Sequence, residues 1–145
     1  MNKLEKILLI ILTIGVVLKL VGLPGGAFLI VLISQALMLY YFPFGVLTLK
    51  GGADDAGIPG YSVAAGIAMA AACLAIMFVF QRWPGANIHR WYGLLFPLAI
   101  LVFSGVKSDT KDFKSYHGAM KLRSGLLFVL VLIAVIRHTL IGEIQ

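Results

Sequence analysis

Charged residues are scarce in this sequence. Only 12% of its 145 residues are Asp, Glu, Lys or Arg, whereas 61% are hydrophobic and the mean hydropathy is +1.00. A soluble domain carries about a quarter charged residues. One small core cannot hide so much apolar surface, so the composition excludes an ordinary soluble domain and predicts an all-α integral membrane protein.

Cysteine and acidic residues are also few. The single cysteine, Cys73, excludes an internal disulfide and makes a poor metal site, so we interpret it as a buried, inert thiol. Six acidic residues stand against 12 basic ones, which gives a net charge of +6. Because the basic residues lie mostly at the ends of apolar runs, the positive-inside rule explains them better than nucleic-acid binding does. The predicted partner is the lipid bilayer, with no nucleic acid.

Apolar segments of about 20 residues, the length that crosses a membrane as a helix, recur five times in one transmembrane domain over residues 1–145. We expect helices at Leu4–Gly22, Gly26–Leu49, Tyr61–Phe80, Ile88–Val106 and Leu122–Leu140. They divide the chain into a hairpin (4–49), a cytoplasmic loop (50–60), a second hairpin (61–106), a basic cytoplasmic loop (107–121) and a fifth helix (122–140). In the fifth helix, Arg123 and Arg137 are expected to extend outwards to the headgroups.

Two Pro-Gly sequences separate the paired helices. Pro24, Gly25 and Gly26 interrupt an apolar run that is long enough for two crossings. Proline ends a helix and glycine tolerates turn conformations, so these residues predict a tight turn between antiparallel helices. Pro84 and Gly85 repeat the arrangement, either through internal duplication or through chance similarity of two turns.

Lysine and arginine counts predict a cytoplasmic N-terminus, with both turns and the C-terminus outside. This orientation places eight basic residues inside and four outside: Lys3, Lys6, Lys50, Lys107, Lys111, Lys114, Lys121 and Arg123, against Lys19, Arg82, Arg90 and Arg137.

Two polar side chains fall inside the first hairpin. Gln35 is predicted about 14 Å below the turn, near the bilayer midplane, where its amide needs partners. An interhelical hydrogen bond is the simpler interpretation, and a role in an ion or proton path is the alternative. Lys19 is predicted to extend to the headgroups, or to contact an acidic group or a lipid phosphate.

The start of the fourth helix gathers His89, Arg90, Trp91 and Tyr92, which are typical of an interfacial anchor. The alternative is a contact site for a headgroup or small molecule, in which Arg90 would bind phosphate and the aromatic residues would flank it. His138 is predicted at the same membrane level and could face His89. His117 lies on the other side of the membrane in this topology, so the histidines make a weak metal or haem site, and we expect no cofactor.

Small residues are dense in the third predicted helix, among them Gly66, Ala68 and Ala72. They favour close packing against another helix, of this chain or of a partner. If the neighbouring helix belongs to a partner, we expect that replacing Ala68 or Ala72 with a bulky residue would make the chain lose this partner while remaining folded. The adjacent Asp54 and Asp55 lie in a glycine-rich loop that does not hold them rigidly, so a catalytic acid–base pair is not expected.

The first hairpin resembles the membrane hairpin of GldL, the proton-driven motor subunit of bacterial gliding and type 9 secretion. The resemblance covers about residues 7–44 and rests on Lys19, Pro24, Gly25, Gly26 and the run Tyr40 to Pro43. It implies a related hairpin and a bacterial inner-membrane setting. The family's intramembrane glutamate aligns with Gln35, and its long cytoplasmic tail is replaced by three further helices, so the resemblance does not imply a proton-driven motor.

The sequence favours a structural or accessory subunit of a larger bacterial inner-membrane assembly, built with other membrane subunits or as a homo-oligomer and without catalytic activity. The alternatives are a channel or transporter component that works as an oligomer, and a membrane enzyme or cofactor protein using His89, Arg90, Tyr92 and His138.

Overall fold

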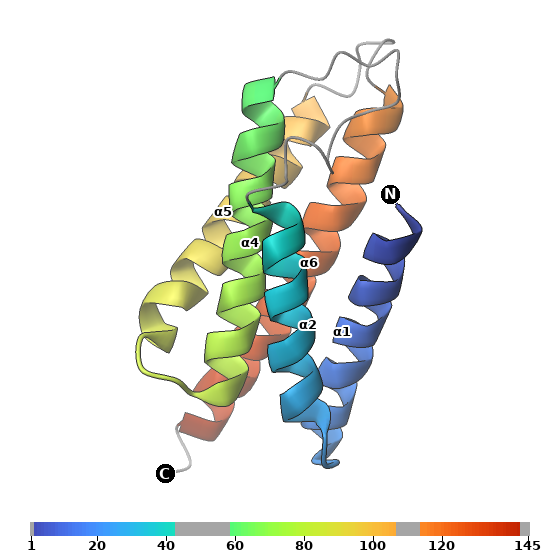
Figure 1. Cartoon of the computed structure of the whole chain (residues 1–145). Coiled ribbons are helices and arrows are strands. Elements are labelled where there is room, and N and C mark those ends of the chain that lie inside the picture. Colours follow the sequence, from blue (N-terminus) through green and yellow to red (C-terminus); the bar gives the residue numbers. More distant parts are fainter. Residues whose placement is uncertain (1, 43–58, 107–113, 143–145) are drawn as a thin grey trace.

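The computed structural model describes residues 2–42, 59–106 and 114–142, which form five helices (Figure 1). They are α1 (Lys3–Val21), α2 (Gly26–Tyr41), α4 (Pro59–Gln81), α5 (Ala86–Val106) and α6 (Lys114–Gly142). The two Pro-Gly turns and the C-terminal end of α6 lie at one end of the bundle, which we call the tip end. The N-terminus lies at the opposite end.

The predicted segments match α1, α4 and α5 to within two residues at each end. The second predicted helix is too long, because α2 ends at Tyr41 and Phe42 is already extended; Pro43 disfavours helical geometry at the residue before it. The fifth predicted helix also differs. It begins at Lys114, eight residues before the predicted start, so the predicted loop over 107–121 is wrong for residues 114–121. The prediction begins this helix at Leu122 because residues 107–121 are polar, but polar residues do not stop a helix in a segment that contains no proline. Residues 43–49 of the second predicted helix, the loop over 50–58 with Asp54 and Asp55, and residues 107–113 lie outside the described residues.

Three of the helices are long and apolar enough to cross a membrane. The candidate spans are Gly60–Gln81, Ala86–Val106 and Gly118–Leu140. Helix α2 is apolar but has only 16 residues, and α1 carries Glu5 near its start and Lys19 near its end. These three apolar helices fit a membrane protein.

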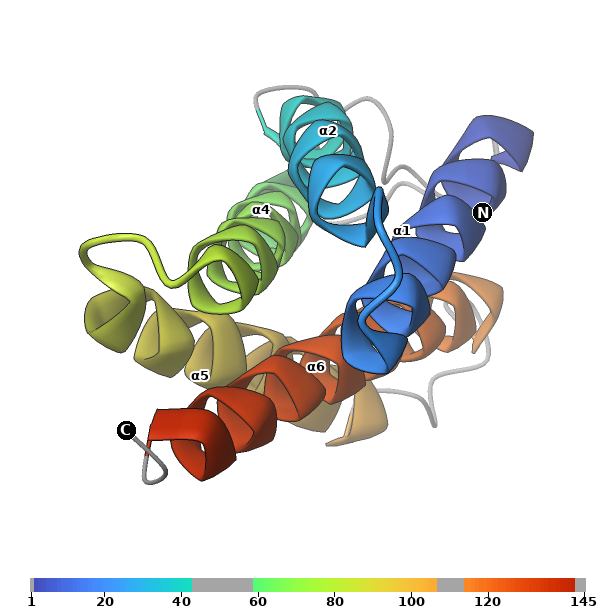
Figure 2. The same ribbon diagram turned by 90° about the horizontal axis from the view of Figure 1, so that it is seen from below.

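Helix α4 packs closely against more of the other helices than any other described helix does. It packs against α2, α5 and α6, while α1 packs against α2 at the far side of the bundle from α5. Figure 2 shows α4 between α2 and α5. The small residues of α4 are what permit this, because Gly66, Ala68 and Ala72 are all buried against neighbouring helices of the same chain. Of the two alternatives left open by the sequence, the structure therefore shows packing within this chain, and a bulky residue at Ala68 or Ala72 would meet the core of the same chain.

The two Pro-Gly turns have the same backbone structure, with each counterpart 60 positions later in the chain. In both turns, the residue after the helix has a left-handed backbone, and the N–H group of the next residue donates a hydrogen bond back to the helix. Leu23 donates to the Leu18 carbonyl at 2.9 Å, and Trp83 donates to the Phe78 carbonyl at 3.1 Å. These bonds close the helix ends in the manner of a Schellman motif. The left-handed φ angles are +81° at Gly22, +87° at Gly25, +55° at Arg82 and +90° at Gly85.

Glycine is required where the helices approach most closely. A Cβ at Gly26 would lie 2.6 Å from the Lys19 backbone nitrogen, so this glycine lets α2 turn back against α1. A Cβ at Gly93 would overlap that of Ala75, so α5 can pack on α4 only through a glycine. The buried Pro97 leaves the Gly93 carbonyl without its helical donor, which loosens α5 at the same point.

Candidate functional site

A bidentate ion pair lies inside the bundle at the end opposite the tips. The Arg123 Nε lies 2.5 Å from Oε1 of Glu5, and Nη2 lies 2.8 Å from Oε2. The Tyr41 hydroxyl donates to Oε1 at 3.0 Å. Glu5 is 0% exposed and Arg123 4% exposed, so both charges are withdrawn from solvent. We call these three residues the Glu5 cluster.

The Glu5 cluster joins three helices: the first turn of α1, the last turn of α2 and the first half of α6. The prediction that Arg123 extends outwards to headgroups is wrong, because its guanidinium points into the bundle. Sequence reasoning missed Glu5 altogether. The signal was present, because the expected topology placed Glu5 and Arg123 at the same membrane level, and opposite charges at one depth among apolar helices tend to pair.

Gln35 lies on the outer face of α2, where its side chain is exposed. The described part of the chain offers its amide no hydrogen bond, so the interhelical bond expected for it does not form within these helices. Its neighbours on this face are apolar and also exposed. Together they form one stripe, which we call the α2 stripe: Phe28, Leu32, Gln35, Leu39 and Phe42.

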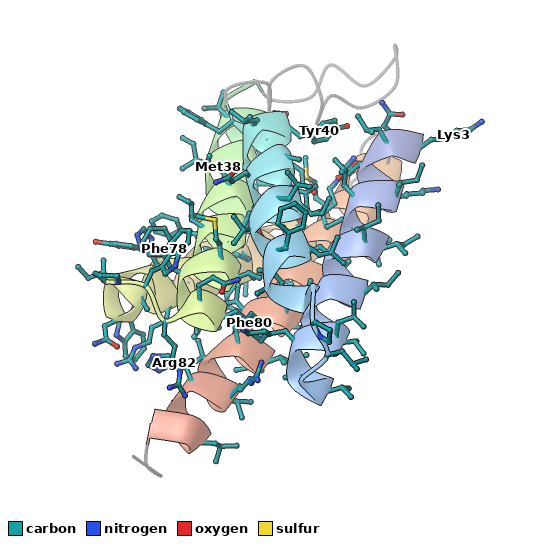
Figure 3. The ribbon with its side chains drawn as sticks, turned by 60° about the horizontal axis from the view of Figure 1, so that its bottom comes forward. Lys3, Met38, Tyr40, Phe78, Phe80 and Arg82 are labelled. Atoms are coloured by element: carbon teal, nitrogen blue, oxygen red, sulfur yellow. The ribbon has the colours of Figure 1, made fainter. Side chains whose placement is uncertain are left out.

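A cavity of about 260 Å³ opens at the tip end between α1, α4 and α6, and we call it the tip cavity. Its lining residues are Lys19, Val79, Phe80, Gln81, Arg82, Ala134, Arg137 and His138. Figure 3 shows Phe80 and Arg82 at the tip end of α4, where α6 passes. The Gln81 side-chain amide donates to the Ala27 carbonyl at 2.9 Å, which fixes the end of α4 against the start of α2.

The aromatic and basic residues at the start of α5 do not converge on one site. The His89 ring packs on Phe78 of α4, with ring centroids 4.2 Å apart. The Arg90 guanidinium lies over its neighbour Trp91, at 5.5 Å from the ring centroid. Tyr92 pairs instead with Phe96, and Trp91 and Tyr92 are both exposed. Successive helical residues point in different directions, which separates these side chains.

His138 lies apart from the aromatic and basic residues at the start of α5, in the wall of the tip cavity. The site expected from His89, Arg90, Tyr92 and His138 is therefore not assembled as a single cluster. Within the described ranges, no three His, Cys, Asp or Glu side chains are placed to hold a metal ion. The side chain of His117 lies outside the described part.

Comparison with protein-family models, with curated proteins and with solved structures gives no match.

Proposed function

We propose that the protein is a non-catalytic subunit of a membrane assembly, and that its α2 stripe packs against the α2 stripe of a second copy of the chain. The observation that carries this proposal is the exposed Gln35 in the middle of an apolar helix face. An amide that faces hydrocarbon without a partner is costly, whereas leucine at the same position would cost nothing. Contact with another protein chain removes that cost.

The spacing of the stripe favours helix pairing. Its four residues within α2 are separated by four, three and four positions, which is the a/d spacing of a coiled-coil seam that includes one polar residue, and Phe42 follows at the helix end. The amide both donates and accepts hydrogen bonds. Two copies related by a twofold axis would therefore satisfy each other's Gln35 with identical chemistry.

The proposed topology has five crossings, with the N-terminus cytoplasmic and both Pro-Gly tips outside, in a bacterial inner membrane. Helix α2 alone spans about 24 Å, short of the roughly 30 Å hydrocarbon core. A span shorter than the core is accommodated by local thinning of the bilayer at a modest cost. The likeness of residues 7–44 to the GldL hairpin supports this setting, but Gln35 carries no proton and gives no support to a motor function.

Transport and catalysis have weaker support. The Glu5 cluster and the tip cavity lie at opposite ends of the bundle, and fully buried apolar side chains such as Leu12, Ile30 and Met69 lie between them. A path through one copy would have to cross this apolar core. The dispersal of the His89, Arg90 and Tyr92 side chains likewise leaves the enzyme alternative without a convergent site.

The decisive test is self-association of Gln35→Leu in bilayers, measured by energy transfer between labelled copies. We expect the association constant to fall about threefold to thirtyfold, the range of an interhelical hydrogen bond. Leu32→Ala, on the stripe, should also weaken association, and Ile7→Ala, an equally exposed position on α1, should not. Unchanged association in Gln35→Leu would refute the α2 contact.

The wider assembly is tested by purifying the chain from its native membrane in mild detergent and identifying by mass spectrometry what travels with it. Defined partners in fixed stoichiometry support the subunit proposal. A chain that travels only with itself refutes the larger assembly and leaves the homo-oligomer to be tested for transport.

A further inference from the structure

The tip cavity concentrates positive charge. Three cations line it, Lys19 from α1, Arg82 from the end of α4 and Arg137 from α6, and His138 adds ring nitrogens. Among the described residues the only carboxylate is that of Glu5, which is paired with Arg123 at the other end of the bundle. Like charges around one small cavity repel each other at low dielectric, so an anion that enters the cavity would be attracted by all three side chains.

Arg137 supplies a donor that the described residues leave unused. Its Nη1 is buried and has no hydrogen-bond acceptor among them. The guanidinium is held over the Phe80 ring, with Cζ 5.8 Å from the ring centroid, and this fixes its orientation. A buried N–H group without an acceptor is uncommon and calls for an explanation.

Arg82 occupies a backbone conformation that favours glycine. Its φ is +55°, and it is the only described non-glycine residue with a positive φ. The equivalent position of the other tip is Gly22, so the fold accepts glycine in this turn. Keeping arginine at a position where glycine would be less strained points to a use for its side chain.

An apolar groove adjoins the charged cavity. It is lined by Leu20, Ile133, Ile136, Arg137 and Leu140, has a volume of about 360 Å³, and shares Arg137 with the tip cavity. A molecule with a charged head and an apolar tail would fill both spaces at once.

From these four observations we propose that the tip cavity binds a phosphate group, held by the guanidinium groups of Arg137 and Arg82 with Lys19 beside them. Guanidinium groups match the geometry of phosphate oxygens, and the cavity has the volume of roughly nine liquid waters, enough for a phosphate with part of its hydration. The adjoining groove favours the headgroup of an anionic phospholipid as the source of the phosphate over the free ion.

The test is equilibrium binding to the full chain in a maltoside detergent, which contains no phosphate. The probes are radiolabelled inorganic phosphate and radiolabelled phosphatidic acid, with unlabelled diacylglycerol of the same acyl chains as competitor. The cavity variants are Arg137→Gln and Arg82→Gly, the second of which keeps a backbone that the other tip already uses. Arg90→Gln is the matched control, because it removes one guanidinium from the same end of the bundle but not from the cavity.

We expect saturable binding of phosphatidic acid that diacylglycerol does not displace, an affinity lowered about tenfold or more in each cavity variant, and no change in the control. Saturable binding of inorganic phosphate with the same dependence on Arg137 and Arg82 also supports the proposal and identifies a soluble anion as sufficient. The proposal is overturned if neither probe binds saturably, if diacylglycerol competes as well as phosphatidic acid, or if either cavity variant keeps the parental affinity. Association through the α2 stripe is measured in a separate experiment, so a negative result there would not change the outcome of this binding test.

Discussion

Breaking the buried pair of Glu5 and Arg123 is expected to destabilise the bundle more than any other single polar substitution. Arg123→Met leaves the Glu5 carboxylate in an apolar interior where, among the described residues, only the Tyr41 hydroxyl remains as a hydrogen-bond partner. Removing one member of a buried ion pair costs about 3–5 kcal/mol, because the remaining charge is uncompensated. The equilibrium between open and folded bundle should therefore shift by between two and nearly four powers of ten.

The structure provides the assay for this prediction. Cys73 is the only cysteine and is 0% exposed in the middle of α4, so a thiol-reactive dye reaches it only when the bundle opens. Under conditions where the bundle closes faster than the dye reacts, the labelling rate reports the opening equilibrium. Arg123→Met should accelerate labelling by about a hundredfold or more.

Two further variants separate charge from packing. The double variant Glu5→Leu with Arg123→Met removes both charges, and well-packed apolar replacements of buried pairs are often neutral or stabilising. It should label far more slowly than Arg123→Met alone. Tyr41→Phe removes one hydrogen bond to a charged group and should cost about 1.5–3 kcal/mol. The reasoning is refuted if Arg123→Met labels within about tenfold of the parent, or if the double variant is as unstable as the sum of the two single ones.

Three other outcomes follow from the packing and the proposed topology. Gly93→Ala should lower the free energy of unfolding by about 1–3 kcal/mol through overlap with Ala75, whereas Gly105→Ala, with open space at its Cβ, should be neutral or slightly stabilising by the same thiol assay. Ala72→Leu should destabilise the isolated chain, and an Ala72→Leu protein as stable as the parent would contradict its place in the core. A reporter fused after Gln145 should read as periplasmic, and a cytoplasmic signal would rule out a five-span chain with a cytoplasmic N-terminus.

The proline and glycine residues of this chain act locally, and for that reason the hairpins could be predicted from the sequence. Pro24 and Pro84 end helices through their own ring geometry, and the following glycines accept positive φ wherever they occur. The scarcity of charge likewise indicates a membrane setting without any knowledge of the tertiary contacts. The first eight residues of α6 could not be predicted as helical from their composition, because a polar segment can be either a loop or the start of a helix.

The sequence by itself determined the helical class, the positions of the two turns and the small-residue character of α4, because each depends on residues close together in the chain. Only the tertiary structure decided which face of each helix points inwards. That rotation places Gln35 outside, Arg123 on Glu5 across 118 positions of sequence, and Lys19, Arg82 and Arg137 around one cavity. Such pairings depend on how the helices rotate and pack against one another. When the whole surface of a helix is apolar, the hydrophobic pattern of its sequence does not show which face points inwards.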